Sequence, residues 1–144
     1  METHIVDITR VIQLAVAPVF LLTAIGTLIT ALSNRLARAV DRRRVIKQQI
    51  EANTEHAAGL RAELAQIQRR VGLIYFAILS SVVAALLVCL VVASAFVGAL
   101  FSFEIAKLVA VLFILAMVAL IVSLSLFLRE IFLAVSFGKA SAEP

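Results

Sequence analysis

The hydrophobic positions of this chain form three long stretches, separated by one long polar segment and one short break. The first stretch runs from Val11 to Leu32 and holds no ionisable residue. A second uncharged stretch runs from Val71 to Phe103, and a third apolar stretch extends from about Ile105 to Leu128. A helix needs roughly 20 apolar residues to cross a hydrocarbon core. The pattern therefore predicts an all-α integral membrane protein with three transmembrane helices.

The second stretch is too long for one upright helix and too short for two, so we expect it to contain a turn. We place this turn after the second span, where glycine and phenylalanine residues suit the membrane interface. The expected division is an outer N-terminal segment at 1–10, transmembrane helices at 11–33, 71–97 and 105–128, a basic cytoplasmic segment at 34–70, a short outer turn at 98–104 and a cytoplasmic tail at 129–144.

The distribution of positive charge predicts the orientation of the three spans in the membrane. The chain is 63% hydrophobic and has a net charge of +4, and nine of its 13 lysines and arginines lie in residues 34–70. The expected turn at 98–104 contains neither residue type. By the positive-inside rule, residues 34–70 are expected in the cytoplasm, with the N-terminus outside and the C-terminus inside. Because the positive charge borders membrane spans, it does not indicate binding to nucleic acid.

The expected role of this arginine cluster is contact with the membrane surface. Clusters of lysine and arginine next to a span bind the headgroups of anionic lipids. Arg35, Arg38 and Arg42 also recur at a spacing that places them close to one helical face. A specific anionic ligand or a protein partner is the alternative, and both interpretations stay open. The residues concerned are Arg35, Arg38, Arg42, Arg43, Arg44, Arg69 and Arg70.

The segment at 34–70 has the pattern of a helical hairpin. Its apolar residues recur at intervals of three and four, which is the spacing of a heptad seam. The first two spans must return to the same bilayer, so the chain has to reverse within the segment. A turn near residues 53–54 makes the two arms nearly equal and places Ile46 opposite Leu60. We therefore predict an antiparallel helical hairpin between the first two spans.

Two stripes of residues mark faces of the spans. The second span has small side chains every four residues, which favours close helix packing; they are Ala77, Ser81, Ala85, Cys89 and Ala93. The first span has a polar seam formed by Gln13, Thr23, Thr27, Thr30 and Asn34. Threonines in membrane helices often bond their own backbone, so this seam is consistent with local bonding and packing. The alternative is that it lines a pore or a small cavity.

The sequence gives little support to an enzymatic function. It contains no zinc-protease, nucleophile or phosphate-binding glycine motif. Its two histidines, His4 and His56, fall on opposite sides of the membrane in the expected topology. We expect no enzyme activity, no cofactor and no metal. No ionisable residue is expected in the middle of a span, which also argues against an ion-coupled transporter.

Parts of the chain resemble a known family. The first span contains "APVFLLT" at 17–23 and continues into "LSNRLARAVDR" at 32–42, and "FLRE" follows at 127–130. In these motifs and in its layout, the chain resembles a bacterial membrane-protein family catalogued as domain of unknown function 2721. The resemblance implies a protein of the bacterial inner membrane, and it supplies no catalytic residues.

These observations lead to an expected class of function. The leading expectation is a non-enzymatic structural or accessory membrane protein, which acts as a homo-oligomer or through its basic cytoplasmic hairpin. Its expected partners are anionic lipids, further copies of itself and an unidentified membrane or cytoplasmic protein. The alternative is an oligomeric pore for ions or small solutes, lined by the first transmembrane helix.

Overall fold

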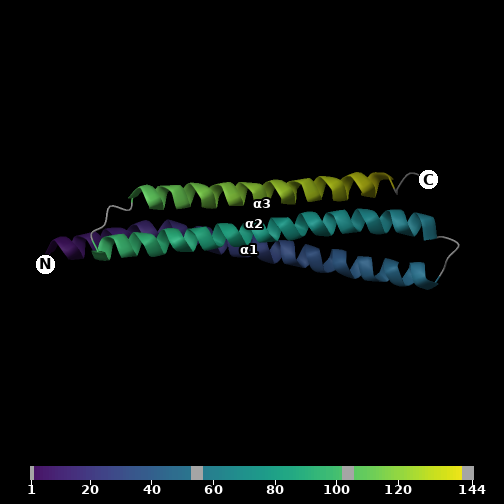
Figure 1. Cartoon of the computed structure of the whole chain (residues 1–144), viewed down its shortest axis with the longest axis horizontal. Helices are drawn as coiled ribbons and strands as arrows, with labels where there is room; N and C mark the ends of the chain where they lie inside the picture. The colour runs from purple at the N-terminus through teal and green to yellow at the C-terminus, as the bar shows by residue number, and fades with distance from the viewer. Residues whose placement is uncertain (1, 53–56, 102–105, 141–144) are drawn as a thin grey trace. The chain divides into compact units, whose positions relative to one another are not determined.

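The computed structural model describes residues 2–52, 57–101 and 106–140, and all of them are helical (Figure 1). Helix α1 spans Glu2–Ala52, α2 spans Ala57–Phe101 and α3 spans Ala106–Ala140. Each helix contains a stretch that is long and apolar enough to cross a membrane. The prediction of an all-α chain with three such helices is therefore confirmed. The turn expected near residues 53–54 lies outside the described residues.

The helices extend well past the apolar stretches that predicted them. Helix α1 begins at Glu2 and continues without a break through the boundary expected at residue 34. Helix α2 reaches Phe101, so residues 98–101 are helical rather than part of a turn, and residues 102–104 lie outside the described ranges. Helix α3 continues to Ala140, deep into the expected tail. Loss of hydrophobicity marks the edge of a bilayer, but it does not end a helix unless proline or a capping residue follows.

The contacts within the chain form two compact units, and each unit takes one part of every helix. Unit 1 consists of residues 1–29 and 80–121, and unit 2 consists of residues 30–79 and 122–144. We describe the two units separately.

Unit 1 has a small, closely packed core. Ile25 of α1, Ala84 and Val88 of α2, and Ala116 of α3 are buried together. The two alanines allow the helix backbones to approach closely, as is usual in membrane helix packing. Ser80 adds a polar contact, because its Oγ donates a hydrogen bond of 2.6 Å to the carbonyl oxygen of Ala119. Helices α2 and α3 are thus joined by both packing and hydrogen bonding.

Unit 2 combines apolar burial with polar contacts. Its buried apolar residues are Leu32, Ile46, Ile67, Ile74 and Ala77. Ser123 of α3 is also buried, and its Oγ donates a 2.8 Å hydrogen bond to the carbonyl oxygen of Ala77 in α2. The next contact between these helices joins Glu130 to Arg70. Residue numbers rise along α3 as they fall along α2, so the two helices are antiparallel in this unit.

Candidate functional site

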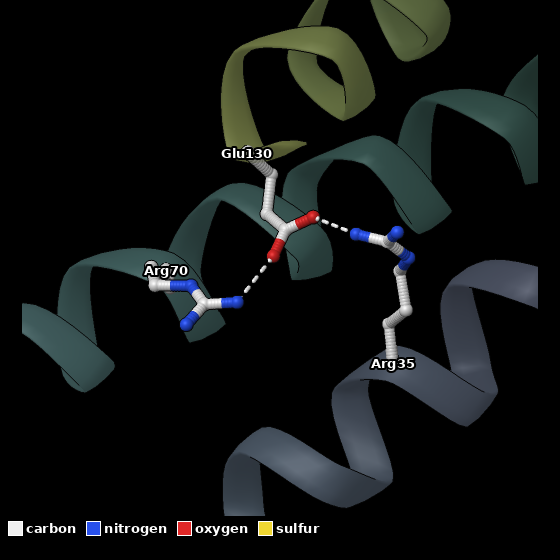
Figure 2. Close-up of polar contacts among 3 residues, drawn as sticks. All are labelled: Arg35, Arg70 and Glu130. Atoms are coloured by element: carbon white, nitrogen blue, oxygen red, sulfur yellow. Dashed lines mark hydrogen bonds and ion pairs between the residues drawn. The ribbon is translucent and has the colours of Figure 1, made fainter. Parts of the chain in front are cut away.

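The most distinctive feature of unit 2 is a buried glutamate on α3. The side chain of Glu130 is 1% exposed, and its carboxylate lies between two arginines from the other two helices (Figure 2). Arg35 of α1 donates from Nη1 to Oε2 over 2.6 Å. Arg70 of α2 donates from Nη2 to Oε1 over 2.8 Å. We call these three residues the Glu130 bridge, because one carboxylate connects all three helices.

The sequence explains why these charges meet. Arg35 follows the end of the first apolar stretch by three residues, and Arg70 directly precedes the second stretch. Glu130 comes two residues after Leu128, the last residue of the third stretch. Ends of apolar stretches that share one side of a bilayer lie at a similar depth. The three charged residues are therefore positioned for contact where the chain leaves the apolar region.

Pairing compensates the burial of this carboxylate. An isolated buried charge costs several kcal/mol, and charge-assisted hydrogen bonds from arginine offset that cost. The arginine side chains remain about one third exposed, at 34% for Arg35 and 33% for Arg70, whereas Glu130 is enclosed by the chain. The Arg35 guanidinium also lies over the ring of Phe127, 5.1 Å from its centroid, in a cation–π contact. Both charge and packing hold Arg35 in place.

A further ion pair joins α1 and α2 at a greater distance from the apolar stretches. Arg42 of α1 donates from Nε and Nη2 to one carboxylate oxygen of Glu63 in α2, over 3.0 and 2.7 Å. The two side chains are 55% and 39% exposed. Exposed pairs of this kind contribute at most about 1 kcal/mol to stability. This contact therefore indicates how α1 and α2 are aligned along their axes, and it contributes little to stability.

The Glu130 bridge and the Arg42–Glu63 ion pair both line one pocket of about 550 Å³. We call it the basic pocket, because four arginines are among its lining residues. Its lining consists of Arg35, Arg38, Ala39, Arg42, Glu63, Gln66, Ile67, Arg70, Glu130 and Ala134. Seven of its ten lining residues are charged or polar, and apolar surface comes from Ile67, the two alanines and the stems of the arginines. Such a wall suits a charged or strongly polar ligand rather than an apolar one.

The structure separates the seven predicted contact arginines into groups. Arg35 and Arg70 belong to the Glu130 bridge, and Arg38 and Arg42 line the basic pocket beside them. The remaining three do not line the pocket: Arg43 is half-buried, and Arg44 and Arg69 are exposed. The predicted surface cluster thus includes four residues that share one site.

The predicted polar seam of α1 lies on the outside of the chain. All five of its members, Gln13, Thr23, Thr27, Thr30 and Asn34, are exposed. Thr23 Oγ1 donates to the carbonyl oxygen of Val19 over 3.2 Å, and Thr27 Oγ1 donates to that of Thr23 over 3.1 Å. These two threonines bond within their own helix, as the first of the two interpretations expected.

The predicted packing stripe of α2 follows the buried face only at its start. Ala77 and Ser81 are buried and Ala85 is half-buried, but Cys89 and Ala93 are exposed. Steps of four residues overshoot a full turn by about 40° each, so the stripe winds away from the neighbouring helices. The buried positions instead alternate steps of three and four, as Ile74, Ala77, Ser81, Ala84, Val88 and Val91. Within this chain, Cys89 and Ala93 are therefore not packing positions.

Sequence reasoning missed the role of Glu130. The Arg129-Glu130 pair reads as an ordinary anchor at the end of the third span, because it is next to an apolar stretch. A usable signal was present, since an acid ends one apolar stretch and arginines end the two others on the same side. Opposite charges at one depth predict a contact if the helices pack with those faces together.

Metal binding has no support in the part of the chain that the structure describes. No group of three or more histidine, cysteine, aspartate or glutamate side chains there could hold a metal ion. The polar groups of the site are instead dominated by guanidinium donors, which bind carboxylates and phosphates.

Comparison with known proteins gives one match. A family model described as "Protein of unknown function (DUF2721)" matches residues 15–139, which include most of α1, all of α2, nearly all of α3 and the whole basic pocket. No curated protein and no solved structure matches the chain.

Proposed function

The chain belongs to the DUF2721 family, whose role is not known, and from its geometry we propose that it is a non-enzymatic accessory membrane protein acting through its basic segment 34–70. The observation that carries the proposal is the Glu130 bridge. Arg35 and Arg70 are the first and last arginines of that segment, and one buried carboxylate of α3 holds both. A segment fixed at both of its ends is suited to present a constant surface to a ligand or a partner.

The proposed form of this segment is an antiparallel helical hairpin. The ion pair between Arg42 and Glu63 supports it, because each residue lies seven positions inside the arginine at its end of the segment, Arg35 or Arg70. Burial of Ile46 and Ile67 supports it as well, since both belong to the predicted heptad seam. The predicted seam also contains seven residues that are half-buried: Leu36, Ala39, Arg43, Ile50, Leu60, Leu64 and Val71.

The proposed location is the bacterial inner membrane, with the hairpin and the C-terminus in the cytoplasm and the N-terminus outside. The concentration of arginine in residues 34–70 supports this orientation. We further propose that the protein self-associates. Three apolar helices leave faces available for other copies, and membrane helices associate through close packing of such faces.

A crosslinking experiment tests the accessory role. A photoreactive amino acid at Gln49, which is exposed on α1 within the segment, is irradiated in intact bacterial membranes. The expected result is one discrete adduct between the protein and a different protein. The matched control places the same group at Leu100, an exposed apolar residue of α2, where no such adduct is expected. Adducts at Gln49 that contain only copies of the chain itself would count against an accessory role.

The alternative function is an oligomeric pore lined by α1. The observation in its favour is that the whole polar seam is exposed on the chain and could therefore face the centre of an oligomer. The backbone bonds of Thr23 and Thr27 weaken this interpretation, because they satisfy the hydroxyl donors locally. Ion flux across liposomes containing the purified protein distinguishes the two functions. A pore predicts flux that Thr27→Leu lowers and Val19→Leu leaves unchanged, whereas the accessory role predicts no flux from either protein.

A further inference from the structure

The basic pocket holds more positive than negative charge. Four arginines and two glutamates line it, so its formal charge is +2. Glu130 is shared by Arg35 and Arg70, and Glu63 is occupied by Arg42. Both acids are therefore already engaged. A further anion in the pocket would balance the remaining positive charge.

The pocket also has more hydrogen-bond donors than acceptors. A guanidinium has five N–H groups and no acceptor, and Arg35 and Arg70 each direct one nitrogen to Glu130. The Nε of Arg70 is buried and has no hydrogen-bond partner among the residues that the structure describes. Arg38 forms no hydrogen bond or ion pair with the described part of the chain, although it lines the same pocket. Such an excess of donors matches the three or four acceptor oxygens of a phosphate group.

The sequence positions of the pocket residues indicate the depth in the membrane at which a ligand would bind. Arg35, Arg70 and Glu130 all lie within three residues of the ends of apolar stretches. These residues place the inner wall of the pocket at the level of the interfacial region, where the phosphate groups of lipids lie next to the hydrocarbon core, and Arg42 and Glu63 extend it away from the apolar stretches. Basic pockets between helices at this level are known to bind lipid headgroups.

From these three features we propose that the basic pocket binds one phosphate group, carried by an anionic phospholipid headgroup or by a soluble phosphate. Arg38 and Arg42 supply the open side of the site, and the Glu130 bridge holds Arg35 and Arg70 as its inner wall. The volume of about 550 Å³ exceeds that of phosphate alone and leaves room for a small polar group attached to it. This inference rests on the proposed function, since it gives the basic segment a ligand.

The test measures binding to the intact protein purified in a nonionic detergent. The probes are a phosphatidylglycerol, a phosphatidylcholine of the same chain length and inorganic phosphate. Native mass spectrometry over a range of lipid concentrations counts the bound lipid, and titration calorimetry measures binding of inorganic phosphate. Saturation at one molecule per chain is expected for the bound probe.

Two single-charge variants separate a site from general attraction. Arg38→Gln removes a pocket arginine and leaves the Glu130 bridge and the Arg42–Glu63 ion pair intact, whereas Arg44→Gln removes an exposed arginine that does not line the pocket. Because charge-assisted bonds from arginine to phosphate are strong, Arg38→Gln is expected to weaken binding about tenfold. Arg44→Gln is expected to change it less than about twofold, as it only alters the distant field.

The outcomes lead to different conclusions. Saturable binding of phosphatidylglycerol that responds to Arg38→Gln but not to Arg44→Gln, without competition from inorganic phosphate, supports the site and identifies a lipid source. The same response for inorganic phosphate supports the site and identifies a soluble source. Equal weakening by the two variants, or no saturable binding of any probe, overturns the proposal. Either of those last results leaves the accessory role standing if Gln49 still crosslinks to another protein.

Discussion

Glu130 is a single charged residue of α3 that contacts both of the other helices. Its carboxylate is buried at the point where three apolar stretches end, and it has one arginine on each oxygen. A buried charge pair does not necessarily stabilise a protein more than apolar residues would. Removing one partner is nevertheless costly, because the other partner keeps its desolvation cost. This asymmetry makes Glu130 the residue whose replacement is most informative.

Replacement of Glu130 by glutamine should destabilise the protein. The neutral side chain leaves two arginines without a counter-charge, but both are about one third exposed and can recover some hydration. We therefore expect a loss of about 1–3 kcal/mol, below the usual range for a fully buried pair. Titration with a denaturing detergent, followed by circular dichroism, measures this loss. The matched control is Glu63→Gln, which breaks an exposed pair and should cost less than about 1 kcal/mol. Equal effects of the two variants would contradict the central role of the Glu130 bridge.

Ser123 provides a second test among the buried polar residues. Its hydroxyl donates to a carbonyl oxygen of another helix, and bonds of this kind in membranes average about 0.6 kcal/mol. Ser123→Ala should therefore destabilise the protein by about 0.5–1.5 kcal/mol in the same unfolding assay. Ser94→Ala is the control, because the Ser94 hydroxyl bonds to Val91 within its own helix. A larger loss for Ser94→Ala than for Ser123→Ala would argue against the interhelical bond.

Among the elements, the long helices combine two environments in one continuous backbone. Helix α1 passes from the first apolar stretch into the basic segment without interruption. Helix α2 begins in the basic segment and continues without interruption into the second apolar stretch. The helices thus carry the packing of the apolar region into the polar region. Ile46 and Ile67 are as buried in the basic segment as many residues of the apolar stretches are.

The hairpin predicts a specific disulfide crosslink. With Cys89 replaced by serine, cysteines introduced at Ile46 and Leu60 should form a bond within one chain under mild oxidation. The control pair places cysteines at Val45 and Leu60, because Val45 is exposed and should face away from the opposite arm. Electrophoresis without reductant separates an internal crosslink, which alters mobility, from a dimer. A crosslink that forms only between chains would disprove this register or indicate an exchanged hairpin.

Much of this element-level picture was accessible from the sequence. The three apolar stretches predicted the three helices, and the two buried residues of the basic segment, Ile46 and Ile67, belong to its predicted heptad seam. The ends of the helices were not accessible, because hydrophobicity reports the membrane edge and not the helix terminus. The charges at the ends of the apolar stretches signalled a contact of Arg35 with Glu130, but the sequence did not give the rotation of each helix about its axis, which decides whether the two side chains meet. The four-residue stripe leaves the buried face of α2 by Cys89, because a helical face follows an average spacing nearer 3.6 residues.

For the whole molecule, the number of copies in the assembly decides between the proposed functions. Light scattering of the purified protein, corrected for bound detergent, measures the protein mass directly. One chain has a mass of 15.5 kDa, and self-association predicts a multiple of that value. Because a water-filled path needs several copies of α1 around it, a ring of three to six chains would favour a pore. A dimer agrees with the accessory role and leaves too few helices for a central path, whereas a monomer would rule out the proposed self-association.

The Glu130 bridge also has a consequence for the order in which the protein is made. Synthesis delivers Arg35 first, Arg70 second and Glu130 last, because these residues lie in that order in the chain. Until α3 has entered the membrane, the two arginines at the ends of the basic segment lack their shared counter-charge. A chain that lacks α3 therefore leaves both of these arginines without that carboxylate. The contact among the three helices forms only after the last of them has been made.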